Sequence, residues 1–180
     1  KNGVRHEDKI SEQTFYWETM EQTNKADQTS QNLCLNDDPA NPRVMVTNIS
    51  SENGAEKGTN MFDGSSGSNS SKWCATTSSG YCDIKFTGGE KTVRRIRIEH
   101  AEAGGEDPAM NTIDFEVLYK DKLSNNWVST GYTYSYNTKG ITDAVLPNAI
   151  TAEEFRLKIN NCGGTPWRAI RIYEWRSEER

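Results

Sequence analysis

The sequence predicts an all-β fold, an antiparallel β-sandwich built from residues 44–176. Short runs in which apolar and polar residues alternate recur along this stretch, and turns rich in glycine, asparagine and aspartate separate them. Helical periodicity is almost absent from the same stretch. A period of two residues is typical of half-buried strands, and many short strands separated by turns are typical of sandwiches and barrels.

The alternation places the strands in order along the chain. Ile96 and Ile98 are separated by charged residues in one run, while Phe115 and Val117 share a face in the next. Tyrosines 132, 134 and 136 alternate in the same way and predict a further strand face. The expected strands cover residues 44–46, 81–86, 92–100, 111–119, 127–136, 155–159 and 169–175.

Composition limits the size of the core and the range of partners. Only 33% of the 180 residues are hydrophobic, yet the chain holds five Trp, seven Tyr and five Phe, which predicts one domain with a small aromatic core. The net charge of −5 disfavours binding to nucleic acids and to anionic lipid surfaces. No apolar run is long enough to span a bilayer, and no leader pattern is present.

Residues 1–43 differ from the rest in being polar almost throughout. Their apolar residues cluster around 15–17, and the segment ends in a turn-rich stretch at 36–43. We expect a polar N-terminal arm or linker over 1–43, followed by a β-sandwich module over 44–180. A short helix and an irregular arm that docks through its aromatic residues are both compatible with this pattern.

The segment 58–74 is rich in serine, glycine and asparagine, and Phe62 and Trp73 lie near its two ends. A hard cation such as calcium can order a loop of this kind by gathering carboxylate, hydroxyl and backbone oxygens. The alternative is a plain linker in which Asp63 and Gly64 form a turn.

Four cysteines, at positions 34, 74, 82 and 162, lack the spacing of a zinc site. Disulfides are the favoured interpretation, with Cys74 paired to Cys82 and Cys34 to Cys162. The other connectivities and buried free thiols also fit the sequence.

A histidine and several carboxylates surround the end of the strand predicted at 92–100. His100 ends this run, and Gly104 and Gly105 allow a sharp turn just after it. Neutral histidine offers one donor and one acceptor, and carboxylates offer acceptors, so such a loop can bind several sugar hydroxyls. The alternative is an ordinary charged surface loop. The four carboxylates of the loop are Glu99, Glu102, Glu106 and Asp107.

Several short motifs follow one another in a characteristic order along the chain. They are Asp63-Gly64, Lys72-Trp73-Cys74, the segment 100–106, Asn111 to Phe115, Asn137 and the closing run 169–174. Their order resembles the discoidin, or coagulation-factor C-type, superfamily, and within it the chain is similar to the family 32 carbohydrate-binding modules attached to secreted bacterial glycoside hydrolases. The resemblance covers about residues 44–176.

This resemblance implies a jelly-roll sandwich with a structural calcium near the loop at Asp63. Asp63, Ser71 and Glu174 would be the calcium ligands. At the sugar site, His100 and Asn137 match the family's hydrogen-bonding residues. Glu106, Asn111 and Trp167 complete the expected site, with the indole ring stacked on the sugar.

The chain departs from the galactose-binding pattern at two places. Residues 129–132 contain no arginine before Asn137, and residues 101–103 contain no aromatic after His100. The expected ligand is therefore a glycan that ends in galactose or in an N-acetylhexosamine, GalNAc or GlcNAc.

The function that we expect is that of a non-catalytic module, secreted or on the cell surface, that binds glycans and tethers an attached glycoside hydrolase to its substrate. It would be a monomeric part of a multidomain chain. One alternative is a discoidin-type adhesion module that binds a protein or a phospholipid. The other is a glycosidase that uses the carboxylates between Glu99 and Asp107, although four acids on one strand and loop hardly form two walls of a cleft.

Overall fold

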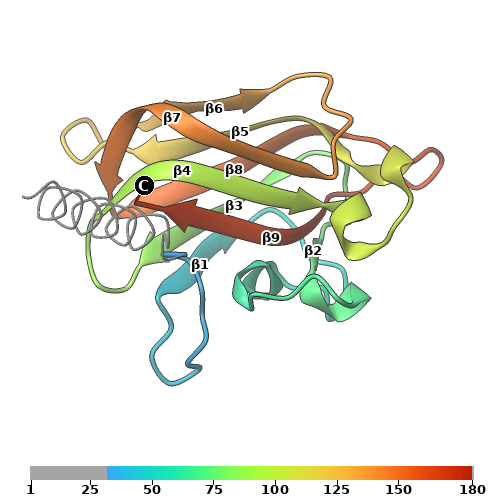
Figure 1. Ribbon diagram of the computed structural model, residues 1–180, viewed down its shortest axis with the longest axis horizontal. Helices are drawn as coiled ribbons and strands as arrows, with labels where there is room; N and C mark the ends of the chain where they lie inside the picture. Colours follow the sequence, from blue (N-terminus) through green and yellow to red (C-terminus); the bar gives the residue numbers. More distant parts are fainter. Residues whose placement is uncertain (1–31, 180) are drawn as a thin grey trace, which may run out of the picture. The chain divides into compact units, whose positions relative to one another are not determined.

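A computed structural model describes residues 32–179, which form two antiparallel sheets (Figure 1). The fold class predicted from the sequence, a β-sandwich, is confirmed. Helical structure in this part of the chain is limited to the 3-10 turns η1 (Gly58–Phe62), η2 (Asn69–Ser71), η3 (Ala101–Gly104) and η4 (Pro108–Met110). Within residues 32–179 no helix has the length and apolar character to cross a membrane.

The larger sheet has five strands in the order β1-β3-β8-β5-β6. Its pairs are in antiparallel register, as in Phe115 opposite Ile159 and Val117 opposite Leu157. These inward-facing side chains are almost fully buried, which is what the alternation predicts. The strands are β1 (Val44–Ile49), β3 (Gly80–Phe86), β5 (Thr112–Lys120), β6 (Trp127–Tyr134) and β8 (Glu154–Cys162).

The smaller sheet has four strands in the order β2-β9-β4-β7. Ile96 and Ile98 of β4 point into the core, and the cross-strand partner of Ile98 on β9 is Trp175. The ring of Trp175 meets that of Phe62 with centroids 5.9 Å apart, so the turn η1 closes one side of the core. The strands are β2 (Trp73–Cys74), β4 (Lys91–His100), β7 (Ile141–Ala152) and β9 (Arg171–Glu178).

Residues 32–43 belong to the sandwich, so the module begins earlier than the predicted boundary at residue 44. Asn32 forms a β-bridge with Glu178, and Leu33 donates its N–H to the carbonyl of Ser177 at 2.7 Å. Cys34 is fully buried in the core. The compact unit starts at Asn32, and the predicted arm over residues 1–31 lies outside the described residues.

The cysteines are buried free thiols, and the predicted disulfides are wrong. Burial raises the pKa of Cys34 to about 12 and that of Cys74 to about 11. Thiolate forms are therefore disfavoured, and these side chains act as small core residues.

Three loops gather where β4, β6 and β8 end, at the right in Figure 1. The strand register brings them together, because Thr112 lies opposite Cys162 and Glu99 lies opposite Ile141. We call this region the loop end and define it as residues 101–111, 135–140 and 163–170. The chain enters at Asn32 and leaves beyond Glu178 on the other side of the sandwich, at the left in Figure 1.

Candidate functional site

His100, the predicted sugar ligand, does not reach the surface. Its side chain is 0% exposed, and its ring packs on Phe115 with centroids 4.8 Å apart. Nε2 lies 2.8 Å from Oγ1 of Thr142. Burial lowers the pKa of His100 to about 3, so the ring is neutral at physiological pH. The structure corrects the prediction, since the last side chain of β4 points into the sandwich.

Asn111 and Asn137 are also buried, at 2% and 8% exposure. Asn111 accepts the N–H of Glu102 at 2.9 Å, and its Nδ2 donates to the Glu102 carboxylate at 3.1 Å and to the Thr138 carbonyl at 3.4 Å. It thereby joins the loop 101–111 to the loop 135–140.

Asn137 holds the turn that it occupies. Its Nδ2 donates to the carbonyls of Thr112 and Lys139 at 2.8 and 3.0 Å, and its Oδ1 accepts the N–H of Lys139 at 3.1 Å. The NH2 group and the oxygen of the Asn137 side-chain amide are therefore both occupied by backbone partners. We call His100, Asn111 and Asn137 the buried polar layer of the loop end; the expectation that they contact a sugar directly is corrected.

Glu106 is engaged by three donors. Its Oε1 lies 2.9 Å from Nζ of Lys72 and 3.4 Å from Nε of Arg171, while Oε2 accepts the hydroxyl of Tyr173 at 2.9 Å. Burial and the neighbouring Glu106 carboxylate raise the pKa of Tyr173, so its hydroxyl stays protonated and donates. Lys72 is only 4% exposed, and its second carboxylate partner is Glu56 at 3.3 Å. Glu106 thus fastens the loop 101–111 to β9.

Each of the other acids in residues 99–107 contacts a different partner. Glu99 pairs with Arg97 at 3.0 Å, Glu102 binds Asn111, and Asp107 accepts the N–H of Ala109 at 2.9 Å. A glycosidase needs two carboxyl groups that face each other across a bound substrate. The contacts of these four carboxylates show no such facing pair.

Trp167 is the one predicted sugar-site residue whose side chain is openly displayed, with 76% of its surface exposed. Its backbone is held: both terminal nitrogens of Arg171 donate to the Trp167 carbonyl at 3.3 Å. Arg171 also contacts Glu106, so the two loops are linked through one guanidinium group. A broad ring on an anchored loop can serve as a platform for the apolar face of a sugar.

Tyr136 is a second exposed ring at the loop end, and the sequence analysis did not assign it to the site. The alternation of Tyr132, Tyr134 and Tyr136 predicts a continuing strand, but β6 ends at Tyr134. Tyr132 and Tyr134 pack in and beside the core, whereas Tyr136 is 88% exposed. One signal in the sequence could have indicated the end of the strand. Asn137 directly follows Tyr136, and asparagine favours turns.

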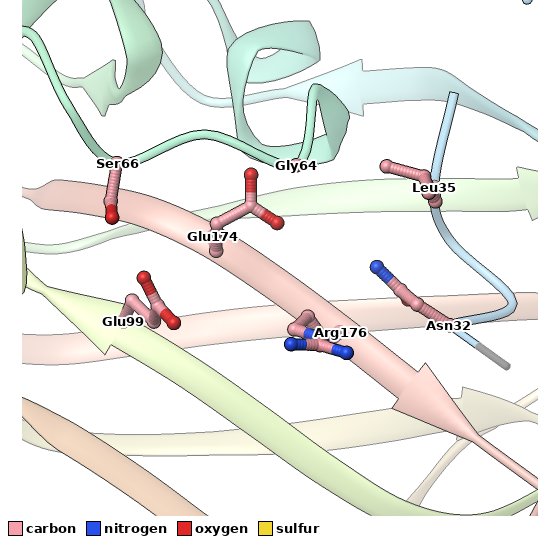
Figure 2. A pocket seen from close by; sticks show the side chains of 7 residues that line it. All are labelled: Asn32, Leu35, Gly64, Ser66, Glu99, Glu174 and Arg176. Carbon is pink, nitrogen blue, oxygen red and sulfur yellow. The ribbon is translucent and has the colours of Figure 1, made fainter. Parts of the chain in front are cut away.

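A cavity of about 220 Å³ lies beneath the loop that follows Asp63 (Figure 2). Glu174 of β9 and Glu99 of β4 point toward it from adjacent strands, where they are cross-strand partners. Like charges placed opposite each other destabilise a sheet unless something compensates them. The cavity is lined by Asn32, Leu35, Gly64, Ser66, Glu99, Glu174 and Arg176.

Glu174 has the environment expected of a cation ligand. It is 3% exposed, and its Oε1 has no hydrogen-bond partner among the described residues. Burial, a hydrogen bond to Asp63 and the charges of Asp63 and Glu99 raise its pKa to about 8. Two carboxyl groups in contact, one with an unsatisfied buried oxygen, are the donors that calcium prefers.

The three expected calcium ligands are only partly brought together. Asp63 meets Glu174, but Ser71 bonds to Ser68 at 3.2 Å and to Ser65 at 3.5 Å within the loop. Ser66 lines the cavity instead. No group of three or more His, Cys, Asp and Glu side chains in residues 32–179 is arranged to hold a metal. Calcium would therefore need hydroxyl and backbone oxygens beside the two carboxylates, and the loop 63–66 offers both.

Known proteins show the same fold and the same family. The model of the F5/8 type C domain matches residues 46–174. The family 32 carbohydrate-binding module of EndoD from Streptococcus pneumoniae superposes with a TM-score of 0.72 at 35% identity, covering 83% of this chain and 100% of that one. No curated protein matches the chain.

Two further modules have the same fold at lower identity. Chitosan-binding module 1 of a chitosanase/glucanase from Paenibacillus sp. IK-5 has a TM-score of 0.58 at 22% identity, covering 82% of this chain and 98% of that one. The family 32 module of Clostridium perfringens NanJ, in complex with galactose, has a TM-score of 0.57 at 16% identity, covering 75% and 93%.

The fold and the displayed ring thus define a class of non-catalytic binding domains. The chain belongs to the F5/8 type C domain family and, within it, to the family 32 carbohydrate-binding modules.

Proposed function

We propose that this module binds glycans that end in galactose or an N-acetylhexosamine, with the sugar stacked on Trp167. The observation that carries the proposal is the exposed indole ring on an anchored loop of a carbohydrate-binding module. A module of the same fold, that of NanJ, has been solved in complex with galactose, which supports a sugar of this size as the ligand. With the buried polar layer occupied internally, the hydrogen bonds to the sugar must come from backbone groups and the exposed polar side chains of the loop end.

The proposal includes a tether. The described chain begins and ends on the side of the sandwich away from the loop end, which supports an attachment point distant from Trp167 (Figure 1). A weakly binding module then acts by raising the local concentration of an attached glycoside hydrolase at its substrate. A secreted or cell-surface location is part of the same proposal, and labelling of intact producing cells with an antibody to the module tests it.

A glycan array followed by calorimetric titration tests the sugar specificity. We expect binding to glycans that end in galactose, GalNAc or GlcNAc, and a loss of that binding in Trp167→Ala. Leu123→Ala is the matched control, because Leu123 is 97% exposed in the turn between β5 and β6 at the opposite end. Equal affinity of Trp167→Ala and the wild type for the best glycan would overturn the assignment of the platform.

We also propose a structural calcium held by Asp63, Glu174 and oxygens of the loop 63–66. The support is the buried, unpartnered Oε1 of Glu174 beside a second carboxyl group. Bound calcium would take the place of the proton that Glu174 holds through its raised pKa, and would order a loop that is otherwise rich in serine and glycine. The ion would lie away from the exposed rings and would not contact the sugar.

Calcium binding to the folded state alone stabilises it by about 4 kcal/mol when the ion is at a thousand times its Kd. We expect the melting temperature to rise by several degrees when calcium is added to chelator-treated protein. Glu174→Gln should lose this response and melt close to the wild type in chelator at pH 7, because Glu174, with a pKa of about 8, is then largely protonated and an amide resembles a neutral carboxyl group. Glu90→Gln, at the turn between β3 and β4, is the control. An unchanged melting curve on calcium addition would exclude the ion.

A further inference from the structure

Tyr136 has a backbone conformation that a tyrosine rarely adopts. Its φ is +55°, in the left-handed region. Among residues 32–179 the other residue besides glycine with positive φ is Asn125, at +58°, and asparagine tolerates this region well. A bulky residue there is strained and persists only where the surrounding structure imposes the conformation.

The ring of Tyr136 does not compensate for this strain, because it is 88% exposed and packs little. The neighbouring residues impose the conformation instead. Asp114 accepts the N–H of Tyr136 at 3.0 Å, and Asn137 donates its own N–H to the carbonyl of Ile113 at 2.9 Å. The side-chain bonds of Asn137 then lock the next turn. An aromatic ring is thus held in water on a fixed backbone, as is Trp167.

The loops that carry the two exposed rings are joined through the neighbours of each ring. The carboxylate that holds Tyr136, that of Asp114, also accepts Nδ2 of Asn161 at 3.3 Å. Asn161 lies near the end of β8, immediately before the loop that carries Trp167. Gly164 of that loop fits against Met110 and the carbonyl of Trp167 so closely that an added Cβ would lie 3.1 and 3.4 Å from them. The two loops are therefore parts of one connected region, whose half-buried side chains include Asp114, Asn161 and Met110.

We propose that the loop end binds an oligosaccharide across two positions, with one pyranose unit on Trp167 and another unit of the same glycan on Tyr136. This rests on the proposed function, because it assumes that Trp167 carries a sugar. Pyranose rings present an apolar C–H face and a rim of hydroxyls. Two aromatic platforms on joined loops, with the Asp114 carboxylate and the Asn161 amide in the region that joins them, suit successive faces and hydroxyls of one chain.

The test compares chain lengths. Galactose, GlcNAc and their β-1,4-linked oligomers of two to six units are titrated into the wild type, Tyr136→Asn, Tyr136→Phe and Leu123→Ala. Asparagine removes the ring and is compatible with positive φ, so the loop is preserved, while phenylalanine keeps the ring. Thermal melts of all four proteins confirm folding.

We expect the affinity of the wild type to rise with chain length by about 3- to 10-fold, the gain of one aromatic contact. Tyr136→Asn should bind the monosaccharide as the wild type does and lose the gain with length, whereas Tyr136→Phe and Leu123→Ala should keep it. A length-dependent gain that survives in Tyr136→Asn, or wild-type affinity that does not change with length, overturns the inference and leaves the proposed function intact. Absence of binding to both sugar series and to GalNAc overturns the two together.

Discussion

Two sets of residues at the loop end differ in where their side chains lie. His100, Asn111 and Asn137 form the buried polar layer, whereas Trp167 and Tyr136 are displayed to solvent. His100 ends β4, and the other four residues occupy segments between strands, where ligand-binding residues are common. The comparison teaches that polar side chains here hold the loops in shape, and that the aromatic side chains are the groups left for a ligand.

The physical reason lies in the backbone of the loops. Loops at the end of a sandwich leave carbonyl and N–H groups without strand partners, and such groups need other partners once they are buried. Amide side chains supply a donor and an acceptor together, so Asn111 and Asn137 suit this role. Indole and phenol rings at the surface satisfy no backbone group, and their display is stable only on loops that are already anchored.

The largest effect that separates the two sets is expected for His100→Ala. It removes a fully buried ring that packs on Phe115. The Thr142 hydroxyl loses one of its partners and keeps its hydrogen bond from the Tyr132 hydroxyl. We expect a loss of about 3 kcal/mol in the free energy of unfolding, measured in urea. A loss below about 1 kcal/mol would show that the ring is not part of the core.

Asn137→Ala should cost about 2 kcal/mol, because it leaves the Lys139 N–H and the Thr112 carbonyl without their partner. Asn160→Ala, an exposed asparagine of β8, is the control and should change stability by less than about 0.5 kcal/mol. Asn137→Ala should also weaken the dependence of affinity on glycan length, since Asn137 anchors the turn beside Tyr136. Equal stability of the two variants would place Asn137 outside the buried polar layer.

The buried histidine also predicts a dependence of stability on pH. The pKa of His100 is about 3 in the folded protein and 6.5 in its ordinary state, so the unfolded chain binds a proton that the folded one does not. Stability from this group is present above pH 6.5 and is lost as the pH falls toward 3. Between pH 7 and pH 5 the wild type should lose about 2 kcal/mol more than His100→Asn. Parallel pH profiles of the two proteins would contradict the neutral, buried ring.

The smallest effect on stability is expected for Trp167→Ala, within about 0.5 kcal/mol of the wild type, because the ring is 76% exposed. Its thermal melt should overlay that of the wild type while glycan binding is lost. A drop of several degrees would mean that the indole packs on the fold in solution, and the contrast between the two sets would no longer hold at this residue.

Some elements could be predicted because their signal is local. The alternation in β4, β5 and β8 follows directly from one face being buried, and the buried Ile96, Phe115 and Leu157 confirm it. The edge strand β7 was not assigned, since Ile141–Ala152 has no clean alternation and contains Pro147. An edge strand pairs on one side only, so its sequence is less constrained.

The sequence by itself determined the fold class, the family and the presence of an aromatic residue in the loop before the last strand. Only the tertiary structure decided which side of the chain each loop residue faces. His100 ends an alternating run, but whether its ring points inward depends on the register of β4 with β7 and β9. The alternation of tyrosines continues in the sequence to Tyr136, but the strand ends before it. Asp114, which is distant in sequence, and the adjacent Asn137 hold the backbone of Tyr136 outside the strand. Side-chain direction at strand ends is set by these long-range contacts, which no local pattern records.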